Sequence, residues 1–465
     1  MSKILFLLLF PATLSSQPNA SIFDHYMRAQ ASLYSFNGNV LVAKNGNIIY
    51  QQSLGYANYS TGEKLNSNSI FDCGSIAKEF TAMGILLLKD KGKINYTDTL
   101  GKFFLELPYK NITVQQLLTH TSGVPNGFAE VVKLFDHNKI ATNTDLIRLL
   151  ASEKPALLFK PGENLLYSGT GFNLLACIIE KISGQPYKIY MDEQVFKPLG
   201  MMHTQVANGP RSAGSIPGLV YGYVYSDSLK KHIRYDSLDS PWTTYLTGIT
   251  GEGMIITTTG DLLKWDRALK NHRLLKEATQ QEMLSRQAAR TAIPKVQFGY
   301  GIRVGKNDFG NYVFHNGYYP GYLSMHICYT DDDITAIVLS NNESHAEFIA
   351  DALVGIALHK NIPAPYIHKE TATKAVSENY AGRYMMRLTT PPYMVEFPVE
   401  FIKKNDTLYI RQGNGAEAAL KQESATKFFF ADGTDQQIEF EPGNNGNIIK
   451  VWHTAWGVKK ELNRL

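Results

Sequence analysis

The amino-acid sequence predicts an α/β (α+β) protein with at least two domains, in which a mixed domain of helices and antiparallel strands precedes a smaller β-rich domain. The first observation is the length of 465 residues, because a single hydrophobic core stops growing at roughly 250–300 residues. The second is that helix and strand patterns alternate up to about residue 360. The third is that short strand patterns dominate the remainder of the chain.

The composition narrows the class of protein. Hydrophobic residues make up 44% of the chain and charged residues 19%, which is ordinary for a globular protein and excludes general disorder. The net charge of +4 comes without a block of lysine or arginine, so we expect no nucleic acid partner. The 3 cysteines are an odd number and their spacing matches no zinc site, which indicates buried free thiols rather than a disulfide framework.

The first residues have the pattern of a secretory signal peptide. Lys3 precedes an apolar run over residues 4–10, and small polar residues follow. This run is shorter than the roughly 20 residues of a membrane-spanning helix, and no later run reaches that length, so we expect no stable membrane span. We therefore expect residues 1–17 to be removed and the protein to be exported, to the periplasm or outside the cell.

The mature chain opens with a predicted β-hairpin and a long helix. Residues 39–54 alternate in polarity around Asn45 and Gly46, which both tolerate the positive φ of a tight turn. A helical pattern then covers residues 75–91 and ends at Gly92. Its apolar positions are so numerous that we expect this helix to be largely buried.

The centre of the chain mixes helices with loops before strands return. Residues 96–269 contain helical patterns at 174–182 and 261–269, separated by stretches rich in Gly, Pro, Ser and Thr. Residues 311–342 predict a strand, a turn and two further strands. A helix over residues 345–359 follows, so the pattern is typical of a sheet covered by helices.

A change of composition divides the chain into domains of residues 18–362 and 378–465. The linker between them, residues 363–377, is rich in Pro, Ala and Thr. The spacing of the later strand patterns favours a small β-barrel or sandwich. These strand patterns occur at residues 380–386, 393–402, 407–412, 426–431, 437–442 and 448–454.

Three Ser-x-x-Lys patterns occur, and their surroundings select one candidate nucleophile. Ser228 lies in a polar turn and Ser424 precedes a strand. Ser75 instead follows a glycine and begins the apolar helix, which places Lys78 almost one turn later on the same face. A serine hydroxyl needs a base in contact, and a lysine can take its proton. Two alternatives stay open, in which Ser75 only caps the helix or Cys73 is the nucleophile.

Three separated stretches resemble the serine β-lactamase and penicillin-binding-protein superfamily, in particular its class C β-lactamase and D-alanyl-D-alanine carboxypeptidase branch. SIFDCGSIAKEFTAMGILLL resembles the first motif, Ser-x-x-Lys. LLYSGTGFNLLACIIEKISGQPY resembles the segment with the second motif, Tyr-x-Asn, and FHNGYYPGYLS resembles the third, Lys-Thr-Gly or His-x-Gly. ITVQQLLTHTSGVP, VFKPLGMMHT and EGMIITTTGDLLKW are also similar to family segments, so the resemblance covers roughly residues 20–360.

The resemblance implies a catalytic role for residues of each motif. Ser75 would attack a carbonyl group, Lys78 would activate it, and Tyr167 would relay protons. Either Lys78 or Tyr167 could be the base in each step. The backbone N–H groups of Ser75 and Tyr318 would form the oxyanion hole. The resemblance implies no metal and no organic cofactor, and it implies an all-helical lobe beside the sheet.

The third motif of this chain reads His315-Asn316-Gly317, and the resemblance places these residues along the opposite wall of the cleft. A histidine here replaces the permanently charged lysine with which the family attracts a β-lactam carboxylate, and a neutral imidazole attracts it less. We therefore expect a dedicated β-lactamase less than a peptidase-like or esterase-like member.

The second motif also departs from the family, because Gly169 stands where the Asn is expected. In the family that amide side chain helps to hold the substrate and the lysine. A glycine can do neither, and Asn173 or a water could partly substitute.

The sequence therefore predicts an exported serine hydrolase that forms an acyl-enzyme with a small-molecule or peptide substrate, namely a D-amino-acid peptide or a small ester or amide. An esterase of the same fold is one alternative. A non-catalytic binding module is the other, in which the C-terminal domain, similar to small lipocalin-like domains, contacts the cell wall or a partner.

Overall fold

We describe the protein from a computed structural model. The signal peptide predicted for residues 1–17 lies outside the described part of the chain and stays a prediction. The structure describes residues 20–125, 135–208, 216–238, 240–290, 296–371, 376–388, 390–391, 395–413 and 415–465.

The first domain is built on an antiparallel eight-stranded sheet with the order β10-β11-β12-β13-β14-β15-β1-β2. Its first hairpin turns at Asn45 and Gly46, whose φ angles of 50° and 77° are positive as predicted. The strands predicted over residues 311–342 are confirmed as β13, β14 and β15. The strands of this sheet are β1 (Gly38–Lys44), β2 (Asn47–Leu54), β10 (Ala288–Arg290), β11 (Val296–Phe298), β12 (Arg303–Asn307), β13 (Gly310–Tyr319), β14 (Tyr322–Tyr329) and β15 (Ile334–Ser340).

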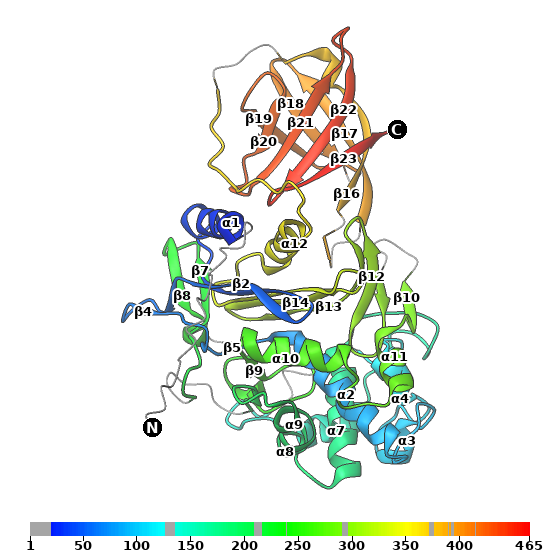
Figure 1. Cartoon of the computed structure of the whole chain (residues 1–465). Coiled ribbons are helices and arrows are strands. Elements are labelled where there is room, and N and C mark those ends of the chain that lie inside the picture. The colour runs from blue at the N-terminus through cyan, green and yellow to red at the C-terminus, as the bar shows by residue number, and fades with distance from the viewer. Residues whose placement is uncertain are drawn as a thin grey trace, which may run out of the picture.

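Helices cover both faces of this sheet (Figure 1). α1 (Ala20–Leu33) and α12 (Ala346–Ala357) lie on one face, and α2 (Ala77–Asp90) and α10 (Thr259–Lys270) lie on the other. Alternate side chains of a strand point to opposite faces, so the sheet contributes to two apolar cores. The fold class of helices on an antiparallel sheet is thereby confirmed.

An all-helical lobe continues below α2 and α10 in Figure 1. The predicted helices at 174–182 and 261–269 are α7 and α10, and both begin earlier than predicted because hydroxyl caps precede them. Ser168 accepts from the N–H of Gly171, and Thr258 accepts from that of Asp261. The lobe contains α3 (Leu100–Phe103), α4 (Val114–Leu118), α6 (Asn143–Glu153), α7 (Gly169–Ser183), α8 (Tyr187–Met191), the π-turn η3 (Asp192–Phe196), α9 (Lys197–Leu199) and α11 (Glu277–Leu284).

Short elements join the lobe to the sheet. β5, β9 and β6 form a small sheet, and two further hairpins pair β3 with β4 and β7 with β8. These elements are β3 (Tyr56–Asn58), β4 (Glu63–Lys64), β5 (Phe71–Asp72), β6 (Gln205–Val206), β7 (Tyr223–Ser226), β8 (Lys231–Arg234), β9 (Ile255–Thr257), and the 3₁₀ turns η1 (Gly74–Ile76), η4 (Tyr235–Ser237) and η5 (Tyr245–Thr247). A further 3₁₀ turn, η6 (Glu378–Tyr380), precedes the C-terminal domain's first strand.

The C-terminal domain is a closed eight-stranded barrel, whose first and last strands pair at Tyr384 and Arg464. The six strand patterns correspond to strands of this barrel, and β19 and β23 were not predicted. In β19 two alanines are exposed and Gln422 is buried, and β23 buries only Val458 and Leu462, so neither sequence shows a clear apolar alternation. The barrel comprises β16 (Gly382–Leu388), β17 (Val395–Lys404), β18 (Thr407–Gln412), β19 (Glu417–Gln422), β20 (Lys427–Phe430), β21 (Gln436–Pro442), β22 (Ile448–Ala455) and β23 (Val458–Arg464).

The barrel packs on α1 and α12, which separate it from the large sheet (Figure 1). The Tyr26 hydroxyl donates to the carbonyl of Trp456 over 3.0 Å, and the Trp456 ring stacks on Phe348 with centroids 4.0 Å apart. Lys460 of β23 pairs with Asp308 over 2.7 Å. Within the described ranges, none of the helices has the length and apolarity needed to cross a membrane.

Candidate active site

Ser75 lies in the 3₁₀ turn η1 that leads from β5 into α2, where two side chains hold the backbone in place. The Asp72 carboxylate accepts from the N–H of Gly74 over 2.6 Å. Ser324 of β14 donates its hydroxyl to the carbonyl of Cys73 over 2.8 Å. Gly74 has a φ of 53°, and a Cβ there would lie 2.6 Å from the backbone nitrogen of Tyr318. The nucleophile turn therefore sits directly against β13.

Lys78 is fully buried, and its Nζ donates over 3.0 Å to the Ser75 Oγ. A second donation goes to the backbone carbonyl of Glu252 over 2.9 Å, and the Glu252 Oε2 lies 3.7 Å away. An uncharged amine has two N–H bonds and one lone pair. When the amine takes the Ser75 proton, its lone pair must face the Oγ, and the Glu252 carbonyl accepts one of its N–H bonds. The Glu252 Oε2, at 3.7 Å, is near enough for an ion pair but too far for a hydrogen bond.

The loop that carries Glu252 is tied to three helices through its backbone. Thr81 of α2 donates its hydroxyl to the carbonyl of Gly251 over 2.6 Å. Asn143 of α6 accepts from the N–H of Thr250, and Asn173 of α7 donates to the carbonyl of Thr250 over 2.8 Å. Asn173 was expected to substitute for the missing motif amide, and this expectation is corrected, because its Nδ2 is committed to the loop and its side chain is buried outside the cavity.

Tyr167 contacts Lys78 through its ring, whose centroid is 4.9 Å from the Nζ. His120 holds this segment, since its Nδ1 accepts from the N–H of Ser168 over 3.1 Å and its ring lies 4.5 Å from that of Tyr167. Burial, followed by the charges of Lys78 and Arg303, holds the pKa of His120 well below its usual value. The imidazole is therefore neutral at physiological pH and acts as an acceptor.

His315 is buried, with 1% of its surface exposed, and it lies 6.1 Å from the Tyr167 ring. Its Nδ1 donates to the carbonyl of Asn316 over 2.6 Å. Burial, followed by the charges of Arg303 and Lys78, holds the pKa of His315 well below its usual value. The third motif thus supplies a neutral side chain at this position.

The third motif was expected to line the cleft, and the structure corrects this placement. His315 and Gly317 are buried behind the wall, where a Cβ on Gly317 would overlap the carbonyl of Cys73. Asn316 points to the opposite face of the sheet and donates to Glu347 of α12 over 3.2 Å, because neighbouring side chains of a strand alternate. The wall itself comes from the residues that follow, starting at Tyr318.

A cavity of about 520 Å³ opens at Ser75. Apolar side chains form most of its lining, and Glu252 is the one carboxylate among the lining residues that the structure describes. The cavity is lined by Gly74, Ser75, Val224, Leu238, Ser240, Trp242, Ile249, Glu252, Gly253, Met254, Tyr318, Tyr319 and Pro320.

Glu252 was not singled out from the sequence, although it is the one acidic residue in the stretch TGEGMIITTTG. Its side chain is 21% exposed and lies beside Lys78. Burial raises the pKa of this carboxyl group, and the charge of Lys78 opposes that shift. The sequence feature that could have pointed to Glu252 is a single charged residue within a run of small and apolar residues.

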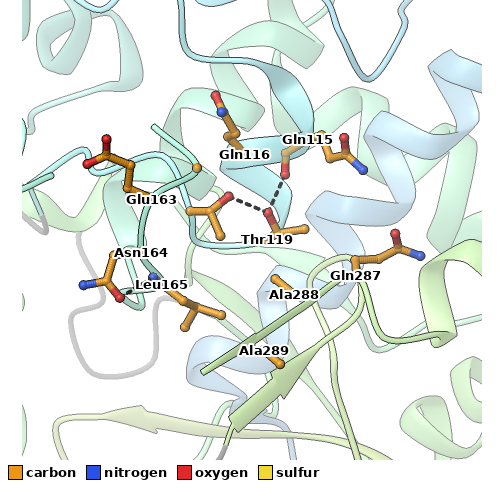
Figure 2. Close-up of a pocket in the computed structure, with 11 residues that line it drawn as sticks. Gln115, Gln116, Thr119, Glu163, Asn164, Leu165, Gln287, Ala288 and Ala289 are labelled. Carbon is orange, nitrogen blue, oxygen red and sulfur yellow. Dashed lines mark hydrogen bonds between the residues drawn. The ribbon is translucent and has the colours of Figure 1, made fainter. Parts of the chain in front are cut away.

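A second cavity, of about 610 Å³, is larger than the first and is lined by residues that include Gln115, Glu163 and Leu165 (Figure 2). Its side chains are mostly amides and hydroxyls that bond to nearby backbone or to each other; Thr119, for example, donates to the carbonyl of Gln115 and contacts the hydroxyl of Thr121. None of the three sequence motifs contributes a catalytic group there. Size alone therefore does not identify the active site.

The chain is similar to known proteins along most of its length. A family model described as Beta-lactamase matches residues 21–359. A penicillin-binding protein of Bacillus subtilis (strain 168) is 32% identical over 422 residues, which cover 89% of this chain and 91% of that protein. The octameric penicillin-binding protein homologue of Pyrococcus abyssi covers 95% of this chain and 99% of its own with a TM-score of 0.66 at 21% identity. A penicillin-binding protein of Bacillus halodurans covers 72% of this chain and 99% of its own with a TM-score of 0.63 at 25% identity.

Proposed function

The chain belongs to the Beta-lactamase family of serine hydrolases, and from that premise we propose that Ser75 forms an acyl-enzyme with D-amino-acid peptides or with small amides and esters. The observation that carries the proposal is the 3.0 Å contact between the Ser75 Oγ and the buried Lys78 Nζ beside the cavity. A serine and a base in hydrogen-bond contact are the requirement for nucleophilic catalysis.

The reaction proceeds in two balanced steps. Ser75 Oγ bonds to the substrate carbonyl carbon while its proton passes to Lys78 or Tyr167, and the same proton leaves with the amine or alcohol when the C–N or C–O bond breaks. Water then attacks the acyl-enzyme, returns a proton to Ser75 and releases the acid. Backbone N–H groups of Ser75 and Tyr318 stabilise the oxyanion, and one such donor typically contributes about 3–4 kcal/mol.

The neutral His315 favours amide or ester substrates over a dedicated β-lactamase role, because the third motif has no cation for a β-lactam carboxylate. An esterase of the same fold remains the second candidate, supported by the largely apolar cavity. Turnover of short nitrophenyl esters without turnover of D-alanyl peptides would favour it.

The proposal is tested by the intact mass of the protein during incubation with a penicillin, while ring opening of the free drug is followed. We expect a persistent adduct on the wild type and none on Ser75→Ala. Ser228→Ala is the matched control, since Ser228 has the same Ser-x-x-Lys pattern in an exposed turn, and it should still acylate.

Fast turnover of the drug would restore the β-lactamase interpretation. Absence of both adduct and turnover would remove the peptidase and β-lactamase interpretations together. If Ser75→Ala then left every measured activity unchanged, the binding module with cell-wall contact would replace the enzyme.

Export is a separate part of the proposal and is supported by the amino-terminal pattern of the sequence. Removal of residues 1–17 would leave a mature protein that begins shortly before α1. Amino-terminal sequencing of the native protein checks this, and an intact Met1 in the mature protein would contradict it.

A further inference from the structure

Glu252 occupies the space that the missing motif side chain would fill. Gly169 stands at the position of the family Asn, at the first residue of α7. A Cβ built on Gly169 would overlap Oε2 of Glu252 and would lie 3.0 Å from Oε1. A side chain at position 169 would therefore require the Glu252 carboxylate to move from its present position. This chain thus has a carboxylate close to the place where the family has an amide.

The carboxylate is held beside the reacting groups. The Glu252 carbonyl accepts from Lys78, and Oε2 lies 3.7 Å from the same amine that contacts Ser75. Glu252 also lines the cavity that opens at Ser75. Its Oε1 is buried and accepts no hydrogen bond from the described residues. The carboxylate thus keeps one buried oxygen without a partner among the described residues, in a side chain that lines the cavity.

A carboxylate in place of an amide changes what the site can recognise. An amide both donates and accepts hydrogen bonds, whereas an ionised carboxylate only accepts them. A carbonyl oxygen of the substrate would be repelled by this group, and an N–H donor would be attracted. The other lining side chains that the structure describes are uncharged, and several are apolar, among them Trp242, Ile249 and Met254. A positively charged donor beside an apolar group fits this cavity.

We propose that Glu252 is a specificity-determining residue, which selects substrates with an unblocked ammonium group next to the scissile carbonyl and with an apolar side chain. Amides, esters and peptides with a free amino terminus are therefore preferred over the corresponding N-acylated compounds, which the site still accepts at a lower rate. The proposal rests on the proposed function of Ser75. It differs from that function in assigning the chemical class that the site accepts.

The first test compares the kcat/KM values of D-phenylalanine p-nitroanilide and its N-acetyl derivative. We expect the wild type to prefer the free amine. A hydrogen bond to a charged group contributes about 1.5–3 kcal/mol, so Glu252→Gln should lower this preference roughly 10- to 100-fold. The ratio of the two probes is the readout, because a general effect on Lys78 changes both rates alike. Glu163→Gln, at an exposed carboxylate of the second cavity, should leave the ratio unchanged.

A second test restores the family arrangement with the double variant Gly169→Asn and Glu252→Gly. The amide now has space, so we expect the preference for the free amine to disappear and the N-acetyl probe to become the better substrate. Gly169→Asn alone should lose stability, because its side chain overlaps the Glu252 carboxylate. A double variant that keeps the wild-type preference would contradict the assignment.

A third test measures binding without turnover. By calorimetry, Ser75→Ala should bind D-phenylalanine amide more tightly than N-acetyl-D-phenylalanine amide, and adding Glu252→Gln should remove the difference. Equal binding of both compounds to Ser75→Ala would overturn the role of Glu252, whatever the enzyme hydrolyses. Rates that do not exceed those of Ser75→Ala for either probe would count against the proposed function, and the calorimetry would still decide the role of Glu252.

Discussion

Position 74 requires glycine because two segments of backbone meet there. Its φ of 53° is a backbone conformation that residues with a Cβ adopt rarely. The backbone of β13 at Tyr318 also passes so close to Gly74 that a Cβ would not fit between the two segments. The turn of Ser75 is pressed against the N–H of Tyr318 as a result. The oxyanion hole that the resemblance implies would depend on this close approach, in addition to the motif residues themselves.

Gly74→Ala should therefore impair both stability and catalysis. The new methyl group would lie 2.6 Å and 2.8 Å from the nitrogen and oxygen of Tyr318, neither of which can rotate away. We expect a loss of roughly 2–4 kcal/mol in the free energy of unfolding, from strain and overpacking, together with a large decrease in the rate of Ser75 acylation. Urea unfolding and the acylation rate measure the two effects.

Gly92→Ala is the control at the other end of the same helix. Gly92 also has a positive φ, of 68°, and a Cβ there has nothing within 4 Å. This variant should lose about 1 kcal/mol from the backbone term alone and acylate normally. Equal effects of the two variants would show that the contact with β13 is unimportant.

The candidate site was predicted from sequence where local pattern was enough. Ser75 and Lys78 share one helical turn, and Tyr167 belongs to a motif of the resemblance, so all three could be named together. Glu252 could not be named from the sequence, because it lies in a loop that is distant in the chain from Gly169 and α7. Only the folded structure brings the two residues together. The role expected for Asn173 was wrong for the same reason, because its Nδ2 donates to the backbone carbonyl of Thr250 in that loop.

At the scale of elements, α2, α10 and β14 are joined by buried charges beneath the site. The Nδ1 of His326 lies 3.3 Å from Glu79, and its Nε2 forms an ion pair with Asp266 at 3.5 Å, which is too long for a strong hydrogen bond. Glu79 also accepts from the indole N–H of Trp265 over 2.6 Å. Glu79 follows Lys78 directly, so this network fixes the helix that carries the base.

This network predicts a pH-dependent stability. Burial lowers the pKa of His326, but Glu79 and Asp266 outweigh it and raise the pKa to about 10. An unfolded histidine titrates near 6.5, so the stabilisation is complete below about pH 6.5 and is lost as the pH rises towards 10. The free energy of unfolding should fall in that window by up to about 1.4 kcal/mol per pH unit.

His326→Gln should be less stable at neutral pH and should lack this slope in urea unfolding measured from pH 6 to 10. His25→Gln, at an exposed position of α1, is the control and should keep the wild-type slope. Parallel profiles for wild type and His326→Gln would mean that His326 is uncharged in the folded protein.

The whole molecule is organised around α1 and α12, which pack against the large sheet and against the barrel (Figure 1). The helix α12 was predicted from the sequence, over residues 345–359. The packing of the barrel against α12 was not predicted. A helix that is apolar on all sides is expected to be buried, but its sequence does not show which part of the protein covers it. The covering surface is the turn between β22 and β23, where Val458 joins the core of the first domain. α1 was not predicted, and its inward side chains include Tyr26.

Trp456 is the side chain through which this contact can be tested. It is 5% exposed, stacks on Phe348 and accepts a hydrogen bond from Tyr26 through its carbonyl. Removing a buried ring of this size lowers the free energy of unfolding by roughly 3–5 kcal/mol. For Trp456 this loss would weaken the contact between the barrel and the first domain. We expect Trp456→Ala to separate the unfolding of the barrel from that of the first domain in a thermal scan.

Trp452→Ala provides the comparison, because Trp452 lies on the same strand pair but is only partly buried on the barrel and contacts Glu441 through its indole N–H. It should lose less than about 1 kcal/mol, as surface substitutions do, and unfold as the wild type does. If the wild type already unfolded in two independent steps, or if Trp456→Ala kept a single unchanged transition, the barrel would contribute little to the stability of the hydrolase domain. A single transition that splits only in Trp456→Ala would show that the barrel stabilises the sheet that carries the third motif through α1 and α12.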